Sequence, residues 1–309
     1  MSRGLDHFPV ARGGIPEEVP GRVPPRLPPC PAGWDGFAAP GSIVWKVNGE
    51  VAILLGWGRA ILLQIAHPLV AAGVAEHSAF RAGPWGRLGR LRRTLETMLA
   101  LTFGTAAEGA QAARRIDAIH GRVRGILRED VGPFPAGTPY WARDPELLRW
   151  VHATLLDSFL RTYELFVGPL TPEEQDRFCL ESSAIGPPLG IPEGFLPTNR
   201  AALHHYLREM IQSGRIVVGP TARDLARDIL APPLPLIGSP LREFLLLPIV
   251  GLLPEPIRSA YGLPWDERRE TALVVAASIS RLVLPRLPPL LRRWPAARRA
   301  ERRARLSSG

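Results

Sequence analysis

His120 has the surroundings of a histidine that could bind a metal cofactor. Ile116 lies one helical turn before it and Val123 three residues after it, so its imidazole would lie beside the apolar stripe of a helix. A neutral imidazole nitrogen in such a groove can supply the axial bond to a haem iron. It can equally belong to a histidine at the edge of the core that is bonded to a carbonyl group. The residues alone leave both interpretations open.

Arg90 and Thr94 are four residues apart and would share one face of a helix, beside its leucines. The planar guanidinium of an arginine matches a carboxylate such as a haem propionate. A threonine hydroxyl could donate to a propionate or steer bound oxygen. Arg93 flanks this pair. A solvated basic face of a helix would have the same residues.

Glu76 lies in a helix of Leu, Val and Ala. A buried carboxylate in such surroundings would have a raised pKa and could act as a base near neutrality, whereas a surface carboxylate would not. The neighbouring His67 and His77 are candidate metal ligands or acid–base groups. However, the His-Glu-x-x-His spacing of zinc proteases is absent from the chain.

Three further histidines have weaker signals. His152 lies one residue off an apolar helix face, near Asp157. We expect it to be packed in the core; the alternative is that it supports the residues of a functional site. His204 and His205 are adjacent on a helix that we expect to be exposed, and we assign them no chemistry.

The elements that position these residues are predicted to be helices. Aromatic residues make up 7% of the chain, which favours helices because strands draw on aromatic and β-branched residues. We expect a single all-α domain of nine to eleven helices, without strands. The helices expected around the candidate residues are Val51–Leu63, bent near Gly56 and Gly58 and resuming through 64–67, then Pro68–Phe80, Gly86–Phe103 and Ala106–Arg128. The later helices are expected near 144–166, 172–185, 198–213, 221–230, 239–253, 255–261 and 266–283.

The two ends of the chain differ from its middle in composition. Residues 1–40 are rich in Pro and Gly and are expected to form an extended arm. The helical domain is expected to span 41–285. Residues 286–309 contain eight arginines and one glutamate and so hold most of the net charge of +9. We interpret this tail as a solvated helix, with acidic lipid or nucleic acid as the alternative partner, and expect no nucleic-acid function.

Several classes of protein are excluded by composition. The two cysteines, Cys30 and Cys179, cannot form a disulfide framework, and the Cys-x-x-Cys-His motif of covalent haem attachment is absent. No signal peptide and no apolar run of ~20 residues are present, so we expect a cytoplasmic protein without a transmembrane segment. The ten-residue run 244–253 is expected to be core, with weak peripheral membrane contact as the alternative. The sequence leaves the oligomeric state open.

Six stretches of the sequence, in order and without large gaps, resemble one family. They are QIAHPLVAAGVAEHS, RLGRLRRT, FGT, IHGRVRG, LRWVHATLLDS and LPTN, within residues 42–275. The family is that of the haem-dependent oxygenases of the MpaB and latex-clearing-protein type. The resemblance implies an all-helical fold with a globin-like core around one haem b.

The resemblance also assigns roles to individual residues. His120 resembles the proximal iron ligand, and Arg90 and Thr94 resemble an Arg-x-x-x-Thr pair beside the haem. Arg93 stands where latex-clearing proteins have a distal lysine; because a guanidinium stays protonated and cannot bind iron, the distal side would be open or filled by water. Glu76 lies near the position of the proposed catalytic base.

The function hypothesis is therefore a haem b oxygenase, an oxidoreductase that uses O2 on an apolar, unsaturated or isoprenoid-like substrate. Glu76, if buried, would remove an allylic proton as oxygen adds. The cofactor would carry out the oxygen chemistry and the protein would orient the reactants. The alternative is a protein without enzymatic activity, either a haem-binding or sensing protein or a helical lipid-binding module.

Overall fold

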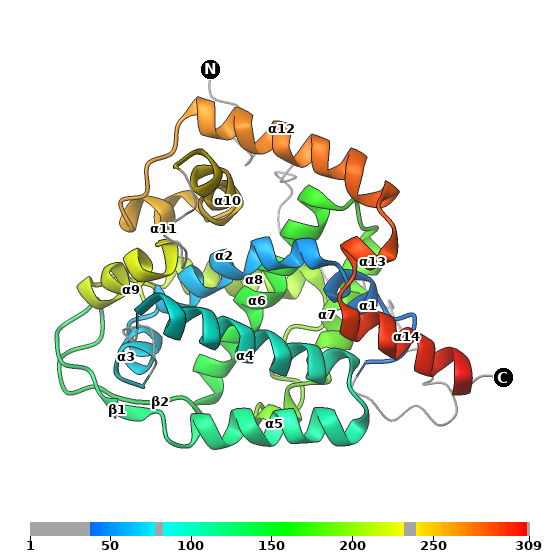
Figure 1. Cartoon of the computed structure of the whole chain (residues 1–309). Coiled ribbons are helices and arrows are strands. Elements are labelled where there is room, and N and C mark those ends of the chain that lie inside the picture. The colour runs from blue at the N-terminus through cyan, green and yellow to red at the C-terminus, as the bar shows by residue number, and fades with distance from the viewer. Residues whose placement is uncertain (1–37, 78–82, 232–238, 308–309) are drawn as a thin grey trace, which may run out of the picture.

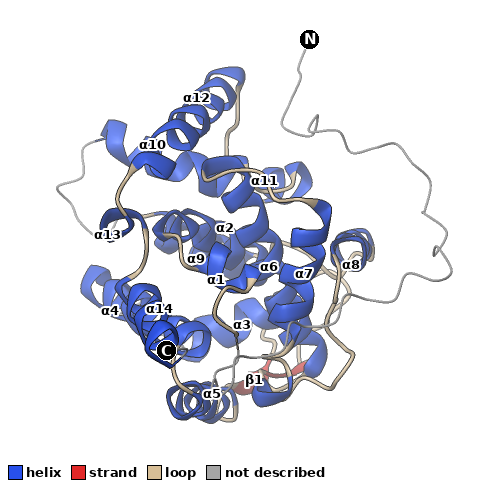
Figure 2. Ribbon diagram, turned by 90° about the vertical axis from the view of Figure 1, so that its right-hand side faces the viewer, coloured by secondary structure: helices blue, strands red, loops and turns tan. Residues whose placement is uncertain are grey.

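A computed structural model describes residues 38–77, 83–231 and 239–307 of the chain, and these are mostly helical, as predicted (Figure 2). The helices are α1 (Ile43–Asn48), α2 (Leu54–Ile65), α3 (Pro68–His77), α4 (Gly83–Phe103), α5 (Ala106–His120), α6 (Pro145–Phe166), α7 (Pro172–Ser183), α8 (Arg200–Gln212), α9 (Pro220–Leu230), α10 (Ser239–Gly251), α11 (Glu255–Ala260), α12 (Glu267–Val283), α13 (Pro289–Arg292) and α14 (Pro295–Ser307). Two strands, β1 (Arg124–Ile126) and β2 (Pro139–Trp141), form a small antiparallel sheet. Residues 1–37, which hold most of the expected arm, lie outside the described part.

The helix starts follow from local capping chemistry. Thr105 and Thr171 each accept a hydrogen bond from the backbone of a glutamate three residues later, and that glutamate bonds back to the threonine's backbone N–H. These capping boxes satisfy donors that the first turn of a helix leaves free. At α6, Asp144 accepts from the N–H of Glu146 with Pro145 in the first turn.

The predicted helix over 106–128 is wrong in its last part. α5 ends at His120, and residues 124–126 form β1 instead, with Arg124 opposite Trp141 and Ile126 opposite Pro139. The apolar spacing continues past His120, but the backbone groups of this segment find partners in β2. The prediction of no strands is therefore also wrong, because the pairing joins segments that are distant in sequence.

Two helices, α2 and α6, lie side by side through the interior (Figure 1). The break expected near Gly56 and Gly58 is not found, since α2 runs uninterrupted through both residues. The glycines serve packing instead. A Cβ atom at Gly58 would lie 2.8 Å from Cγ1 of Ile249 in α10, so the missing side chain lets these helices approach closely.

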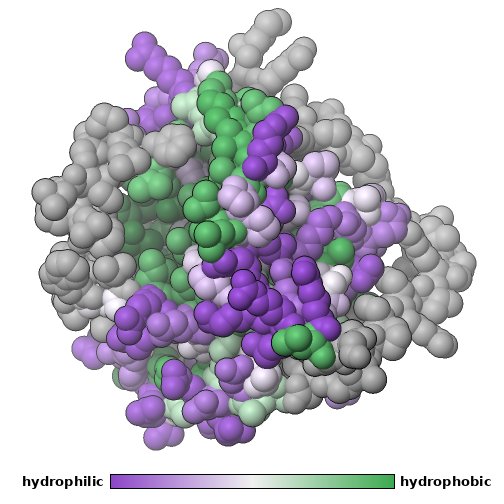
Figure 3. Space-filling view, turned by 45° about the vertical axis from the view of Figure 1, so that its right-hand side comes forward, coloured by the Kyte–Doolittle hydropathy of each residue, from purple (hydrophilic) through white to green (hydrophobic). Residues whose placement is uncertain are grey.

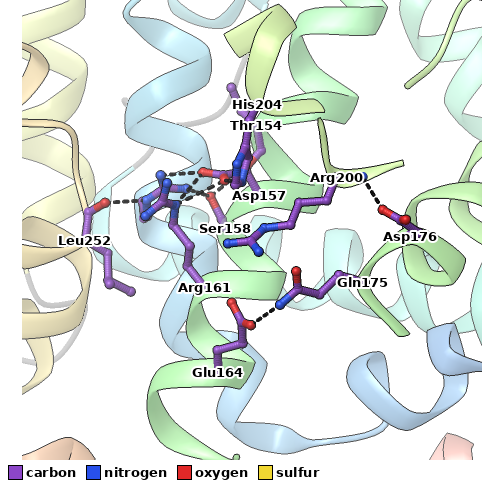
Figure 4. A network of polar contacts seen from close by, with 11 residues as sticks. Thr154, Asp157, Ser158, Arg161, Glu164, Gln175, Asp176, Arg200, His204 and Leu252 are labelled. Atoms are coloured by element: carbon purple, nitrogen blue, oxygen red, sulfur yellow. Dashed lines mark hydrogen bonds and ion pairs between the residues drawn. The ribbon is translucent and has the colours of Figure 1, made fainter. Parts of the chain in front are cut away.

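A buried ion pair joins the same two helices. Arg59 of α2 donates to the Asp157 carboxylate of α6 at 2.6 Å, and both side chains are almost fully buried. Arg59 also donates to Ser158 Oγ and to the carbonyl of Leu252, each at 2.6 Å. Figure 4 shows Asp157, Ser158 and Leu252 gathered at this point, with His204 close by. His204 Nε2 lies 3.6 Å from Asp157 Oδ1, so this histidine takes part in the network although we had assigned it no chemistry.

The C-terminal helices complete the outside of the molecule. α14 lies against α4 (Figure 1), and Ala297 and Ala300 on its inner face are fully buried. Arg303 donates to the carbonyl of Phe103 at 2.5 Å. The tail is thus helical, as expected, but one face of it packs on the domain rather than lying wholly in solvent.

Apolar residues also reach the surface. Val275, Ile279 and Leu282 of α12 are each more than half exposed. Figure 3 shows apolar side chains gathered in a band where α12 lies. Within the described segments, no single helix has both the length and the apolar character to cross a bilayer; the pair Val51–Ile65 and Pro68–His77 passes that test only together, with a 108° bend. In the run 244–253, Pro248, Val250 and Leu253 are buried, as expected of core, whereas Leu245 is exposed.

Candidate functional site

A cavity of about 510 Å³ lies between the helices of the domain. Four of the helices that line it each contribute one row of side chains, which we call the stripe of that helix. The residues of a stripe are three or four positions apart, as expected of one face of a helix. The stripes are Leu54, Trp57, Ile61 and Gln64 of α2, Leu91, Thr94, Met98 and Leu101 of α4, Ile116 and His120 of α5, and Leu148, His152, Leu155 and Phe159 of α6. The lining is mainly apolar with a few polar groups, which is typical of a small-molecule or cofactor pocket.

His120 lines this cavity as the last residue of α5. Its Nδ1 is enclosed and has no hydrogen-bond partner among the described residues. Burial lowers the pKa of His120, Asp117 raises it and Arg143 lowers it, and the net pKa lies below the ordinary value. Asp117 also pairs with Arg143 at 2.6 Å, and burial, the largest cause, outweighs the effect of its carboxylate on the His120 ring. The ring is therefore neutral near pH 7.

The α4 wall includes one member of the predicted Arg/Thr pair. Thr94 lines the cavity four residues before Met98. The backbone of Arg90 belongs to α4, but its side chain lies outside the described part of the structure. Arg93 is exposed and is not part of the cavity wall; its carbonyl accepts a hydrogen bond from Thr97 Oγ1 at 2.8 Å. His120 and Thr94 thus share one cavity, whereas Arg93 lies outside it.

A second imidazole faces the same cavity from α6. His152 is 8% exposed, and its Nε2 is enclosed without a hydrogen-bond partner in the described segments. Burial lowers the pKa of His152 to about 4, so the ring is neutral. We had expected a packed residue here. The spacing of His152 from Leu148, Leu155 and Phe159 predicts that the four share one face of the helix. The sequence does not indicate that this face borders a cavity.

Two aromatic rings pack against each other between α2 and α6, beside the cavity. The rings of Trp57 and Phe159 stack with centroids 6.2 Å apart and an interplanar angle of 22°. Both residues line the cavity. Because α2 and α6 are also held by the Arg59–Asp157 pair, their cavity-facing stripes sit on rigid elements.

Glu76 lies at the end of α3, outside the cavity wall. It accepts hydrogen bonds from Tyr140 Oη and Arg128 Nε, both at 2.6 Å. The Tyr140 hydrogen bond is the main cause that lowers the pKa of Glu76 below its ordinary value, with Arg128 adding to the effect. Glu76 is therefore neither buried nor raised in pKa, although its predicted role as a base depended on both. That role stays a prediction. His77 lies beside it, with Nε2 3.2 Å from the carbonyl of Arg124.

His67 is buried away from the cavity. Its Nδ1 accepts a hydrogen bond from the N–H of Leu69 at 3.3 Å, and its ring packs 5.3 Å from that of Phe134. In the part of the chain that the structure describes, no group of three or more His, Cys, Asp and Glu side chains could hold a metal ion. His67 and His77 therefore form no such group with other described residues.

Comparison with known proteins places this fold and cavity in a family. Residues 45–282 match the family described as "ER-bound oxygenase mpaB/B'/Rubber oxygenase, catalytic domain". The chain belongs to this oxygenase family. The match covers the whole of α2, α4, α5 and α6, which are the helices whose stripes line the cavity.

Two curated relatives are similar to the chain. They are the uncharacterized proteins Mb2261 of Mycobacterium bovis and Rv2237 of Mycobacterium tuberculosis. Each is 28% identical over 226 residues, which cover 72% of this chain and 85% of the relative. No solved structure shows a significant match to the chain.

Proposed function

We propose that this member of the oxygenase family binds haem b in the cavity between α2, α4, α5 and α6 and uses O2 to oxidise an apolar, unsaturated or isoprenoid-like substrate. The single observation that carries the proposal is the position of His120: a neutral imidazole with an unpartnered ring nitrogen on the wall of a mainly apolar cavity. The family match supports the oxygenase class.

The residues present fit a haem better than a metal held by side chains alone. A porphyrin supplies four nitrogen ligands to its iron, so one histidine of the protein would suffice to hold it. The cavity of about 510 Å³ lies in the range of cofactor and ligand sites, roughly 300–1,000 Å³. His120 would hold the iron, and Thr94, with Arg90 beside it on α4, would bind a propionate.

The bound haem would supply the O2 chemistry. The chain's own contribution is positioning. His120 keeps its lone pair free because burial lowers its pKa. Leu155, Met98 and Ile116 offer aliphatic walls that bind an apolar chain and exclude water, and exclusion of water strengthens any polar contact inside the cavity. The family resemblance still proposes Glu76 as a base, but its proton transfer would need the carboxylate to leave Tyr140 and Arg128.

An absorbance spectrum of protein expressed with a haem precursor tests the cofactor. We expect a strong Soret band that His120→Ala removes. His205→Ala is the matched control, because His205 is exposed and outside the cavity wall, and it should keep the band. A colourless wild-type protein, or an unchanged spectrum in His120→Ala, would reject the assignment.

The apolar cavity would also suit a lipid carrier or a haem sensor, so a second measurement separates these from an oxygenase. Oxygen consumption by the haem-loaded protein with a panel of unsaturated lipids and isoprenoids should rise above that of His120→Ala. Haem binding without oxygen consumption on any member of the panel would favour the carrier or sensor.

A further inference from the structure

His152 is a buried polar side chain that the proposed function has not yet used. It borders the same cavity as His120 but comes from a different helix. With 8% exposure it is more than nine-tenths buried, and its Nε2 finds no partner among the described residues. Leaving a buried polar atom unpaired costs free energy, so such an atom in a folded protein needs an explanation.

His67 is a second buried histidine, and its contacts differ from those of His152. His67 is fully buried and also has an Nε2 without a partner in the described segments, but its Nδ1 accepts a hydrogen bond from the Leu69 backbone and its ring packs on Phe134. It does not border the cavity. His67 thus has a structural task, whereas His152 borders the cavity, and its Nε2 is enclosed without a partner among the described residues.

The surroundings of His152 offer it no other polar partner on its own face of α6. Leu148 precedes it by one turn, and Leu155 and Phe159 follow it, all of them on the cavity wall. A neutral imidazole carries one N–H and one lone pair. An N–H in apolar surroundings forms a stronger hydrogen bond than it would in water.

We propose that His152 is a positioning residue whose ring N–H donates a hydrogen bond to a small polar ligand, a diatomic molecule or a small anion, bound in the cavity beside the cofactor that His120 holds. This inference rests on the proposed haem site and adds a polar contact on α6 to it. His152 and His120 then have different tasks: one imidazole binds the iron and the other orients what binds next to it.

Azide and carbon monoxide are the probes. In the haem-loaded protein, His152→Leu should weaken azide binding to ferric haem roughly three- to tenfold, the effect of one lost hydrogen bond. It should also raise the C–O stretching frequency of the ferrous carbon monoxide complex, because a donor near the oxygen lowers that frequency. His152→Gln keeps an N–H donor and should recover part of both effects. His67→Leu is the matched control and should change neither.

Each contrary result has a distinct meaning. Unchanged azide affinity and C–O frequency in His152→Leu would show a packed residue and overturn the inference. Loss of the Soret band in His152→Leu, with the band kept in His120→Ala, would make His152 the iron ligand and also overturn it. Absence of the band in the wild type would instead reject the proposed function, and this inference with it.

The haem-free protein gives an independent readout. Since no described residue hydrogen-bonds Nε2 of His152, His152→Leu should leave the melting temperature of the haem-free protein unchanged or raise it. A marked fall in melting temperature would show that the imidazole is part of the structure itself and would count against the proposed ligand contact.

Discussion

Gly56 of α2 lies so close to Thr162 of α6 that a Cβ atom added to the glycine would collide with Oγ1 of the threonine. The same Cβ would lie 2.9 Å from the carbonyl oxygen of Ser158. A backbone carbonyl within a helix cannot move aside alone, so any side chain at position 56 would push the two helices apart. These helices carry two walls of the cavity, and the glycine therefore sets how closely the walls approach.

Gly56→Ala should destabilise the fold by about 1–3 kcal/mol, the usual cost of overpacking a close contact. The free energy of unfolding from urea titration checks this. Gly168→Ala is the matched control, because an added Cβ there meets no atom within 4 Å. Equal stability of the two variants would contradict the tight crossing of α2 and α6.

The Arg59–Asp157 pair leads to a second prediction. Burial lowers the pKa of Arg59 to about 10, although the Asp157 carboxylate opposes that shift. Arg59→Met removes a buried partner of Asp157 and leaves Arg161, whose Nε donates to the same carboxylate at 3.0 Å. We therefore expect a cost of about 3 kcal/mol of unfolding free energy, the lower end of the usual range for a broken buried pair. The double variant Arg59→Met, Asp157→Leu should regain a large part of this loss. A double variant no more stable than the single one would contradict a dominant role of the buried charge.

The stability of the haem-free protein should fall as the pH is lowered from 6.5 to 4. Burial lowers the pKa of His67, with Arg215 adding to the effect, and burial lowers that of His152, in both cases from 6.5 to about 4. In this window the unfolded chain binds protons that the folded chain does not, so acid favours unfolding. Each histidine contributes a slope of up to about 1.4 kcal/mol per pH unit.

Urea unfolding at several pH values measures that slope. His67→Leu should be less sensitive to pH than the wild type between pH 4 and 6.5, by the contribution of one histidine. His205→Ala, a change at an exposed position, is the control for the loss of a histidine as such. An identical slope in His67→Leu would show that His67 is not held neutral by the fold.

Two isoleucines on α5 test the cavity itself. Ile116 lines the cavity one turn before His120, whereas Ile119 is 49% exposed and outside the wall. Ile116→Trp should fill part of the space and weaken uptake of haem by the haem-free protein, because the indole occupies volume that the ligand needs. Ile119→Trp should bind haem as the wild type does. Haem titration followed by absorbance measures both, and equal affinities would place the ligand elsewhere.

Local signals predicted much of the helical fold. The Thr105–Glu108 and Thr171–Glu174 capping boxes, and Asp144 before Pro145, mark helix starts that depend only on residues within one turn. The hairpin of β1 and β2 could not be predicted in this way. Its strands are short, and the partner of Arg124 lies 17 residues further along the chain, at Trp141.

The sequence also predicted only part of the candidate site. The i, i+4 spacing of Ile116 and His120 and the family motifs singled out His120, and the structure brings it and Thr94 to one cavity. The motifs also singled out Glu76 and Arg93, whose side chains lie outside that wall. Glu76 differs from the expectation because Tyr140, on a strand that the sequence did not indicate, binds its carboxylate.

By itself, then, the sequence determined where the helices begin, which of their faces are apolar and which family the motifs resemble, because each depends on residues close together in the chain. The tertiary structure alone decided that His152 borders a cavity and that His67 does not, although both are buried imidazoles among apolar residues. The reason is physical: burial follows from local patterning, but whether a buried face meets a neighbour or an open space depends on how α2, α4, α5 and α6 pack together.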